Sequence, residues 1–294
     1  MMPELLFAMP GNEALAKNLA AALGCGIGTL VTRKFPDGET YLRFDSAIGG
    51  RHIALVSALN DPDSKIVPLL FAADAARAMG AAKVGLVAPY LAYMRQDRSF
   101  QPGEAVTSRA MAALLSQHFD WLATVDPHLH RYKSLAELYT IPVTAVHAAP
   151  AVSAWIVAHV KNPFLIGPDE ESAQWVSETA RDINAPYATL KKIRHSDRSV
   201  TVSAPDMATI GDRAPILLDD IISSGQTMLE AVRLLQAQGI AHPICLAVHG
   251  LFADHSDRAL IKRGARLVTT NSVPNPYAQI DLTRLLADGL RATV

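Results

Sequence analysis

The sequence is short of cysteine, of net charge and of long hydrophobic runs, and each shortage excludes a class of protein. Its 294 residues include two cysteines, Cys25 and Cys245, which are too few for a disulfide framework or a zinc site. Both stand among apolar residues, so we expect two buried thiols. The 27 basic and 28 acidic residues leave a net charge of −1, without the basic surface that binds nucleic acids or acidic membranes. Any anionic ligand must therefore be held by local groups.

Membrane insertion and export are not expected either. A membrane-spanning helix needs roughly 20 apolar residues in a row, and the long apolar stretch 68–87 is interrupted by an aspartate, an arginine and a lysine. Residues 1–18 contain Glu4 and no basic region before their short apolar run, unlike a signal peptide. With 50% hydrophobic and 19% charged residues, the composition is that of a globular protein. We therefore expect a cytoplasmic protein.

Short apolar runs alternate with longer amphipathic stretches along the chain. Continuous apolar runs indicate strands buried on both faces, and the amphipathic stretches between them indicate helices. The pattern predicts an α/β fold with mostly parallel sheets flanked by helices. The expected strands are residues 52–58, 83–89, 120–125, 163–167, 214–218, 243–248 and 265–270. The expected helices are residues 63–80, 104–118, 171–183, 227–239 and 279–292.

A weak internal repeat indicates two similar domains in tandem. Residues 51–91 and 213–251 share the order strand, loop, helix, glycine and strand. We expect an N-terminal domain of residues 1–146 and a C-terminal domain of residues 147–294. Residues 279–294 belong either to the second domain or to a helix that packs back on the first. The loop in the first copy of the repeat lacks the acidic and hydroxyl residues found in the second.

The stretch 215–232, PILLDDIISSGQTMLEAV, combines groups that suit different parts of one ligand. An apolar strand ends in Asp219 and Asp220, and a helix begins after a short loop of serines and glycine. Ligands of parallel sheets bind beyond the carboxyl ends of the strands, where a loop entering a helix offers N–H groups to an anion. Two carboxylates would repel that anion, but they accept hydrogen bonds from neighbouring sugar hydroxyls. The combination describes a ribose 5-phosphate group.

The same residues also fit a purely structural role. Serine, threonine and aspartate commonly cap helix N-termini, and the helix dipole favours acidic residues there. The residues by themselves support the capping and the ligand-binding interpretations about equally. The loop is not a Walker loop, because no lysine follows Gly225.

Six segments resemble ribose-phosphate diphosphokinases, the phosphoribosyl pyrophosphate synthetases, in the same order along the chain. They are GNEALAKNLAAALG, RKFPDGETYLRF, PYLAYMRQDRSFQPGEAVTSRAMAALL, DPHLHRYKSLAELYTIPV, GPDEES and ILLDDIISSGQT. The resemblance implies two tandem phosphoribosyltransferase-like domains, the first on the nucleotide side and the second for ribose 5-phosphate. It also implies transfer of the diphosphoryl group of ATP to the anomeric hydroxyl of ribose 5-phosphate, which gives phosphoribosyl pyrophosphate and AMP for nucleotide biosynthesis. The implied ribose-5-phosphate site consists of Asp219, Asp220, Ser223, Ser224, Gly225, Gln226 and Thr227.

The resemblance assigns the nucleotide site to two other segments. In the family, the residues that match Phe35, Asp37 and Glu39 reach the adenine from a neighbouring subunit, so a homo-oligomer is implied. An aromatic face and two acceptors suit a base with an exocyclic amine, although Pro-Asp-Gly is also an ordinary turn. Arg95 and Gln96 match nucleotide ligands, and a guanidinium group binds phosphate oxygens well. A solvated basic turn is the alternative for these two residues.

The remaining implied roles concern the metal ion and the transferred group. His128 and Asp169 match residues that hold Mg²⁺ at the nucleotide, although Mg²⁺ ordinarily prefers oxygen ligands. Lys192 and Arg194 in the stretch 188–200 match the lysine and arginine of the family's catalytic loop, and His128 is counted with them as catalytic. Two cations over the diphosphoryl group would stabilise developing charge and exclude water. An exposed, basic hairpin is the alternative.

The chain departs from the family's common pattern in its phosphate loop. Ser223 and Ser224 replace an aspartate and a threonine, and Gln226 replaces a glycine. Backbone donors survive these changes, so binding is expected to persist. Two other functions stay open: a type I phosphoribosyltransferase, whose loop the segment 215–227 also resembles, and an inactive regulatory homologue. The motifs RQDR and KIR argue against the first, and the retained acidic, basic and histidine residues argue against the second.

Overall fold

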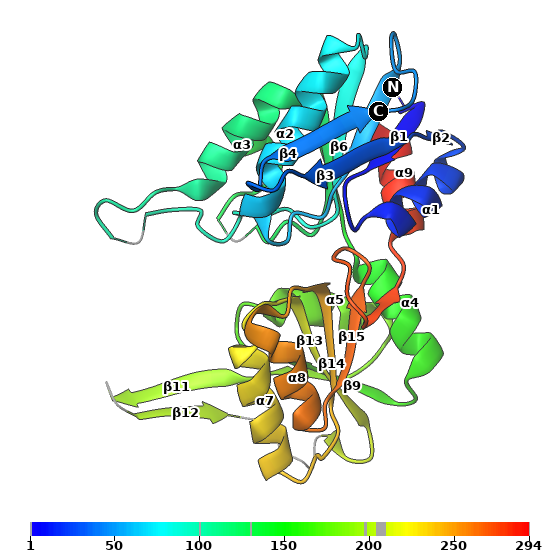
Figure 1. Cartoon of the computed structure of the whole chain (residues 1–294). Coiled ribbons are helices and arrows are strands. Elements are labelled where there is room, and N and C mark those ends of the chain that lie inside the picture. Colours follow the sequence, from blue (N-terminus) through cyan, green and yellow to red (C-terminus); the bar gives the residue numbers. More distant parts are fainter. Residues whose placement is uncertain (1, 100, 130, 197–198, 204–209, 294) are drawn as a thin grey trace. The chain divides into compact units, whose positions relative to one another are not determined.

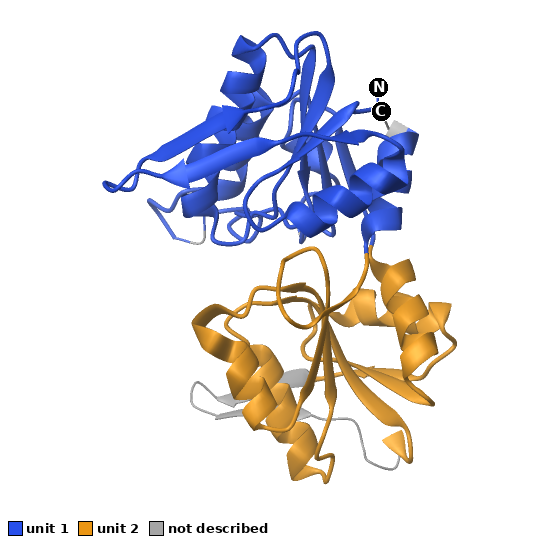
Figure 2. Cartoon of the chain, turned by 45° about the vertical axis from the view of Figure 1, so that its right-hand side comes forward, with its two compact units in different colours: residues 1–147, 282–294 blue, residues 148–281 orange. Residues whose placement is uncertain are grey.

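The computed structural model describes residues 2–293 except residues 100, 130, 197–198 and 204–209. For residues 191–196, 199–203 and 293, the description is limited to the backbone. The chain forms two compact units, one of residues Met1–His147 with Leu282–Val294 and one of residues Ala148–Asp281 (Figure 2). The helices in the described part of the chain are all too short or too polar to cross a membrane.

Unit 1 contains a parallel sheet with helices packed against it (Figure 1). The sheet has the order β2-β1-β5-β6-β7-β8, and a separate antiparallel pair is formed by β3 and β4. The strands are β1 Leu5–Ala8, β2 Gly26–Ile27, β3 Leu30–Lys34, β4 Thr40–Phe44, β5 His52–Val56, β6 Lys83–Ala88, β7 Trp121–Val125 and β8 Val143–Val146. The helices are α1 Glu13–Leu23, α2 Pro62–Ala78, α3 Thr107–His118 and α9 Thr283–Thr293, with the 3-10 turn η1 Leu135–Glu137.

Unit 2 repeats this plan. Its parallel sheet has the order β10-β9-β13-β14-β15-β16, and β11 and β12 form an antiparallel pair outside it. The strands are β9 Pro163–Gly167, β10 Tyr187–Thr189, β11 Lys191–Ser196, β12 Ser199–Ser203, β13 Ala214–Ile222, β14 Ile244–Gly250, β15 Arg266–Thr270 and β16 Ala278–Ile280. The helices are α4 Ala149–His159, α5 Ala173–Asp182, α7 Gln226–Ala237 and α8 Ser256–Lys262, with the 3-10 turn η2 Ala253–His255.

The two sheets have the same topology, which confirms the predicted fold of two tandem α/β domains. In each sheet, the strand that comes second along the chain, β2 or β10, lies at one edge. The first strand, β1 or β9, lies beside it, and the remaining strands follow in chain order. Strands β5 and β6 of the first copy of the repeat correspond to β13 and β14 of the second. The two antiparallel hairpins also correspond, because each is inserted between the second and third strands of its sheet. The hairpin with Phe35 at its turn is therefore the topological counterpart of the hairpin with Lys192.

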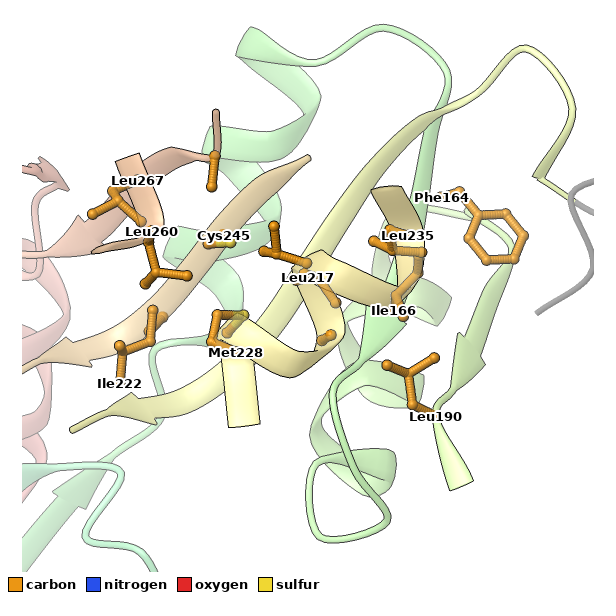
Figure 3. Close-up of a cluster of buried hydrophobic side chains, with 14 of the residues drawn as sticks. Phe164, Ile166, Leu190, Leu217, Ile222, Met228, Leu235, Cys245, Leu260 and Leu267 are labelled. Atoms are coloured by element: carbon orange, nitrogen blue, oxygen red, sulfur yellow. The ribbon is translucent and has the colours of Figure 1, made fainter. Parts of the chain in front are cut away.

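The core of unit 2 fills the space between its sheet and the helices α7 and α8 (Figure 3). Leu217 and Cys245 from neighbouring strands meet Met228 and Leu235 of α7 and Leu260 of α8, and all five are at most 1% exposed. Fully burying a leucine side chain contributes about 1.5–3 kcal/mol. This core holds α7 against β13 and α8 against β15.

The two cysteines differ in burial. The thiol of Cys245 is buried as expected, and burial raises its pKa. The prediction that Cys25 is buried was wrong. This residue follows α1, and its side chain is only partly buried. Burial still raises the pKa of the Cys25 thiol.

The end of one strand and the start of one helix differ most from the boundaries predicted from the sequence. Strand β13 continues to Ile222, whereas the apolar run predicted an end at residue 218. The extension forms because β14 also continues, so that Ile222 pairs with Gly250. The helix predicted over 279–292 begins later, since residues 278–280 form strand β16 and α9 spans Thr283–Thr293.

Helix α9 belongs to unit 1, where it contacts α1 and β8. The side chain of Arg291 donates a hydrogen bond to the carbonyl of Ala22 at the end of α1. Helix and strand approach closely at Gly289, where an added Cβ would lie 2.4 Å from Val146 Cγ1. The last helix thus completes the N-terminal unit.

Candidate active site

The carboxyl ends of β9 and β13 bring three carboxylates into one region of unit 2. The two strands are parallel neighbours in the sheet, with Leu217 opposite Ile166. Asp169 follows the end of β9, and Asp219 and Asp220 lie in the last part of β13. The strand predicted from the sequence stopped at residue 218, just before the acidic pair. In the structure, β13 continues to Ile222 and contains both aspartates. Strand pairing fixes their backbone more firmly than a loop would.

The environment of Asp219 disfavours its negative charge. Burial raises the pKa of this carboxyl well above its ordinary value, and the nearby carboxylates of Asp220 and Asp169 raise the pKa further. A hydrogen bond of 3.0 Å from the Asp220 backbone N–H to Asp219 Oδ1 opposes the shift. Ligands that supply positive charge or hydroxyl donors would relieve this repulsion. A carboxylate group with a pKa raised by burial and by like charges is a candidate functional site.

Asp169 also has a structural role. Its Oδ1 accepts hydrogen bonds of 3.1 Å from the backbone N–H groups of Glu171 and Ser172, just before α5. The Ser172 hydroxyl donates in return to the Asp169 carbonyl at 2.7 Å. These bonds hold the segment between β9 and α5 in place. The carboxylate direction is thereby fixed before any ligand arrives.

The loop between β13 and α7 is short and ends in a left-handed residue. Gly225 has φ 71° and ψ 3°, a conformation that costs a residue with a side chain more than it costs glycine. Helix α7 begins at Gln226, and no side chain in the described part of the chain caps its N-terminus. The first N–H groups of a helix lack intrahelical partners and carry the positive end of the helix dipole. The loop 223–227 therefore has donors for a phosphate group.

The corresponding loop of unit 1 bonds to itself instead. It lies between β5 and α2, and Lys65 Nζ donates to the Ala58 carbonyl at 2.9 Å and to Asn60 Oδ1 at 2.7 Å. Burial lowers the pKa of this lysine. The Ser64 hydroxyl donates to Asp61 Oδ2 at 2.7 Å. The first copy thus fills this loop with its own side chains, although within the described residues the N-terminus of α2, like that of α7, has no side-chain cap.

In unit 1, the predicted site residues Arg95, Gln96 and His128 lie on two loops at the same edge of the sheet. Arg95 and Gln96 follow β6, and His128 follows the parallel neighbour β7. Arg131 joins the loops, because its Nη1 donates to Asp97 Oδ1 at 2.6 Å and to Asp97 Oδ2 at 2.9 Å. This pair was not predicted from the sequence. Its only signal was the presence of both residues in the quoted motifs.

The loop that carries His128 has an unusual backbone. Asp126 has φ 32° and His128 has φ 55°, so two residues with side chains are left-handed within one turn. The Asp126 carboxylate is partnered by His147, whose Nδ1 lies 3.0 Å from Asp126 Oδ1. Strained backbone held by specific contacts is typical of functional loops.

The hairpin of β3 and β4 places Phe35, Asp37 and Glu39 at its turn. The Phe35 ring is 38% exposed, and the Arg33 guanidinium lies 4.5 Å from its centroid. Asp37 and Glu39 are exposed, and Asp37 Oδ1 accepts a hydrogen bond of 3.2 Å from the Glu39 N–H. Beside the turn, a cavity of about 420 Å³ is lined by residues of the hairpin and of α2, including Phe71. The turn is therefore both ordered and accessible.

Lys192 and Arg194 lie on β11, with Val202 and Val200 of β12 as their pairing partners. The backbone of this stretch is an antiparallel hairpin, the arrangement that the sequence analysis gave as the alternative to a catalytic loop. The side chains of Lys192 and Arg194 lie outside the described part of the structure. Their catalytic role stays a prediction.

Comparison with known proteins decides the family. Residues 5–118 match the N-terminal domain of ribose phosphate pyrophosphokinase, and residues 137–284 match the phosphoribosyl transferase domain. The ribose-phosphate pyrophosphokinase of Methanopyrus kandleri is 32% identical over 289 residues, which are 97% of this chain and 98% of the relative. The chain belongs to the ribose-phosphate pyrophosphokinase family.

Two further relatives of the pyrophosphokinase family extend this result. The enzyme named ribose-phosphate pyrophosphokinase in Halobacterium salinarum is 32% identical, over 97% of this chain and 100% of the relative. The crystal structure of phosphoribosylpyrophosphate synthetase from Mycobacterium smegmatis is similar with a TM-score of 0.84 and 26% identity, over 98% of both chains. The match covers both units, which confirms the resemblance seen in the motifs and the predicted fold.

The residues present suit Mg²⁺ that arrives with a nucleotide better than a protein-only metal site. Within the described ranges, no three histidine, cysteine, aspartate or glutamate side chains meet closely enough to hold an ion. Mg²⁺ commonly takes one or two carboxylates and completes its shell with phosphate oxygens and water. The carboxylate group of Asp169, Asp219 and Asp220 fits this pattern, since an ion would offset its repulsion. His128 lies in unit 1 and Asp169 in unit 2.

Proposed function

We propose that the protein is a ribose-phosphate diphosphokinase that transfers the diphosphoryl group of ATP to ribose 5-phosphate. The products are phosphoribosyl pyrophosphate, a precursor in nucleotide biosynthesis, and AMP. The observation that carries this function is the family match over both units, 5–118 and 137–284. A phosphoribosyltransferase would need only the second of these regions. The function is that of a transferase with two substrate sites.

The ribose-5-phosphate site is proposed to be the end of β13 and the loop that follows. Asp219 and Asp220 would accept hydrogen bonds from the two ring hydroxyls of the pentose. The N–H groups of residues 223–227 and their hydroxyls would hold the phosphate at the N-terminus of α7. The raised pKa of Asp219 supports this role, because hydroxyl donors would stabilise the charge that burial disfavours. The sugar is thus held at both ends with its anomeric hydroxyl left to react.

The nucleotide site is proposed to be the edge of unit 1 that carries Arg95, Gln96 and His128. The Arg131–Asp97 pair supports this, since it ties the two loops together near these residues. Phe35, Asp37 and Glu39 would bind the adenine of a neighbouring subunit, and their exposure on a projecting turn supports a homo-oligomer. The exposed apolar side chains of Val67 and Phe71 on α2, both 50% exposed, add surface that a second copy would cover.

In the reaction, the anomeric oxygen attacks the β-phosphorus of ATP and the bridging oxygen leaves with AMP. Such transfers depend mainly on positioning and on stabilisation of charge. Bound Mg²⁺ would neutralise charge on the phosphate oxygens, with Asp169 and His128 as its proposed protein ligands. Lys192 and Arg194 would contact the transferred group and exclude water. The consumption of ATP and the two unpaired cysteines support the cytoplasm as the site of action.

An assay of the purified full chain tests the function. With ATP, ribose 5-phosphate and Mg²⁺, the protein is expected to release AMP and phosphoribosyl pyrophosphate in equal amounts, as followed by phosphorus NMR. Omitting ribose 5-phosphate is expected to abolish AMP release. Absence of AMP with any divalent ion would contradict the proposal. Base release from a nucleotide and pyrophosphate would then indicate a phosphoribosyltransferase, and ligand binding without turnover a regulatory homologue.

A further inference from the structure

The segment between β14 and α8 lies directly against the loop that is proposed to bind phosphate. Ser256, the first residue of α8, is 3% exposed, and its hydroxyl donates to the Ser223 carbonyl at 3.0 Å. The N–H groups of Leu251 and Phe252 both donate to the Ile222 carbonyl, at 2.9 and 3.2 Å. Two consecutive carbonyls at the start of the loop are therefore held by a segment from elsewhere in the chain.

The side chain of Ser256 also fits closely against Gly225. A Cβ added at Gly225 would lie 2.7 Å from Ser256 Cβ and 3.9 Å from Leu260 Cδ1. Leu260 packs with Met228 and Ile222 in the core beneath the loop (Figure 3). The loop and α8 are thus in direct contact, and a small residue is needed on each side. A serine at 256 meets this need and adds a hydrogen-bond donor.

The segment that delivers Ser256 is fixed by its own contacts. Phe252, Asp254 and His255 have φ values of 49°, 53° and 58°, a region that residues with side chains adopt only when their surroundings hold them there. Tyr277 provides such contacts, because its ring packs edge-on against Phe252 with centroids 5.3 Å apart. Its hydroxyl donates to Asp257 Oδ2 at 2.9 Å. The position of Ser256 is therefore defined from both sides.

The Ser223 carbonyl controls the direction of a predicted phosphate donor. It shares one planar peptide group with the N–H of Ser224, and in a trans peptide these two groups point in opposite directions. A hydroxyl that holds the carbonyl therefore also holds the N–H. We infer that Ser256 is a positioning residue for the ribose-5-phosphate site. It acts by fixing the Ser223–Ser224 peptide, and this inference rests on the proposed function of the loop.

Steady-state kinetics of Ser256→Ala test the inference. The variant keeps the Cβ contact with Gly225 and loses only the hydroxyl. The KM for ribose 5-phosphate is expected to rise roughly three- to tenfold, the loss of about one hydrogen bond. The kcat and the KM for ATP are expected to stay near the wild-type values, because the bond orients one substrate loop only. A merely structural role would lower the amount of active protein and leave both KM values unchanged.

The matched control is Ser177→Ala. Ser177 lies on α5 of the same unit, and its hydroxyl also donates to a backbone carbonyl, that of Gln174 at 2.8 Å. This variant is expected to keep the wild-type KM for both substrates. If Ser256→Ala does not fold, Ser256→Cys serves instead, since it keeps the side-chain size and weakens the donor. An unchanged KM for ribose 5-phosphate in the folded Ser256 variant overturns the inference, as does an equal rise for both substrates.

Failure of the proposed function is recognised separately. If the wild-type protein releases no AMP, the proposed function fails, and calorimetric titration with ribose 5-phosphate then replaces the kinetics. Weaker binding by Ser256→Ala than by wild type and Ser177→Ala would still support the positioning role. Equal affinity of all three proteins would overturn it.

Discussion

Lys192→Ala is expected to lower kcat by about 100- to 1,000-fold while the KM for ATP changes little. The reason is that a cation beside the transferred diphosphoryl group stabilises charge that develops in the transition state more than charge in the bound substrate. Loss of such a group therefore affects turnover rather than affinity. In the backbone of the hairpin, Lys192 pairs with Val202. Initial rates over a range of ATP concentrations give both parameters.

Lys191→Ala is the matched control, because it removes the same charge from the neighbouring position of the same strand. Its kcat is expected to stay within about threefold of wild type, well short of the loss predicted for a transition-state contact. Equal losses for both variants would mean that the basic hairpin acts only through its overall charge. An unchanged kcat for Lys192→Ala would remove this residue from the mechanism.

Asp219→Asn is expected to raise the KM for ribose 5-phosphate by about 10- to 100-fold, since a hydrogen bond to a charged group contributes roughly 1.5–3 kcal/mol. The same change is expected to raise the melting temperature of the substrate-free protein. Asparagine has nearly the same shape, but it removes the charge that burial, Asp220 and Asp169 disfavour. Binding and stability are thus predicted to change in opposite directions.

The stability gain has a defined pH dependence. The pKa of Asp219 is raised in the folded protein, whereas in the unfolded chain it is about 3.9. At a pH below that value, the carboxyl is neutral in both the folded and the unfolded protein. Asp219→Asn is then no more stable than wild type. As the pH rises above that value, the unfolded chain ionises first, so the wild type loses stability relative to the variant until the folded pKa is passed. Melting temperatures of both proteins between about pH 4 and pH 8 measure the difference.

Asp212→Asn is the control for loss of one negative charge in unit 2. This aspartate is exposed, and it accepts a hydrogen bond of 3.3 Å from Asn162. Its melting temperature is expected to remain near that of wild type across the pH range. A substrate-free Asp219→Asn protein that melts below wild type at neutral pH would show that the carboxylate is stabilised by contacts rather than strained.

The sequence predicted the central strands of both sheets because these carry uninterrupted apolar runs. Strand β9 has the predicted bounds, and β5, β6, β7, β13, β14 and β15 were found within a few residues. The hairpin of β3 and β4 was missed, since its residues are partly exposed and polar and lie outside the main sheet. The extension of β13 was missed because two adjacent aspartates look like a loop until the pairing with β14 is known.

The candidate site could be predicted only where its residues share a local motif. Asp219, Asp220 and the loop to Gly225 stand together in one stretch, so their chemistry was visible in the sequence. Ser256 lies 33 residues beyond Ser223, and no local pattern connects the two. The Arg131–Asp97 pair likewise joins positions 34 residues apart. Such supporting contacts depend on tertiary packing.

A crystal structure of the protein with ribose 5-phosphate tests the central claim most directly. The account predicts electron density for the pentose with its two ring hydroxyls at Asp219 and Asp220. The phosphate is predicted at the backbone of residues 223–227, at the start of α7. Sugar phosphate bound in another cleft, with this loop empty, would contradict the account.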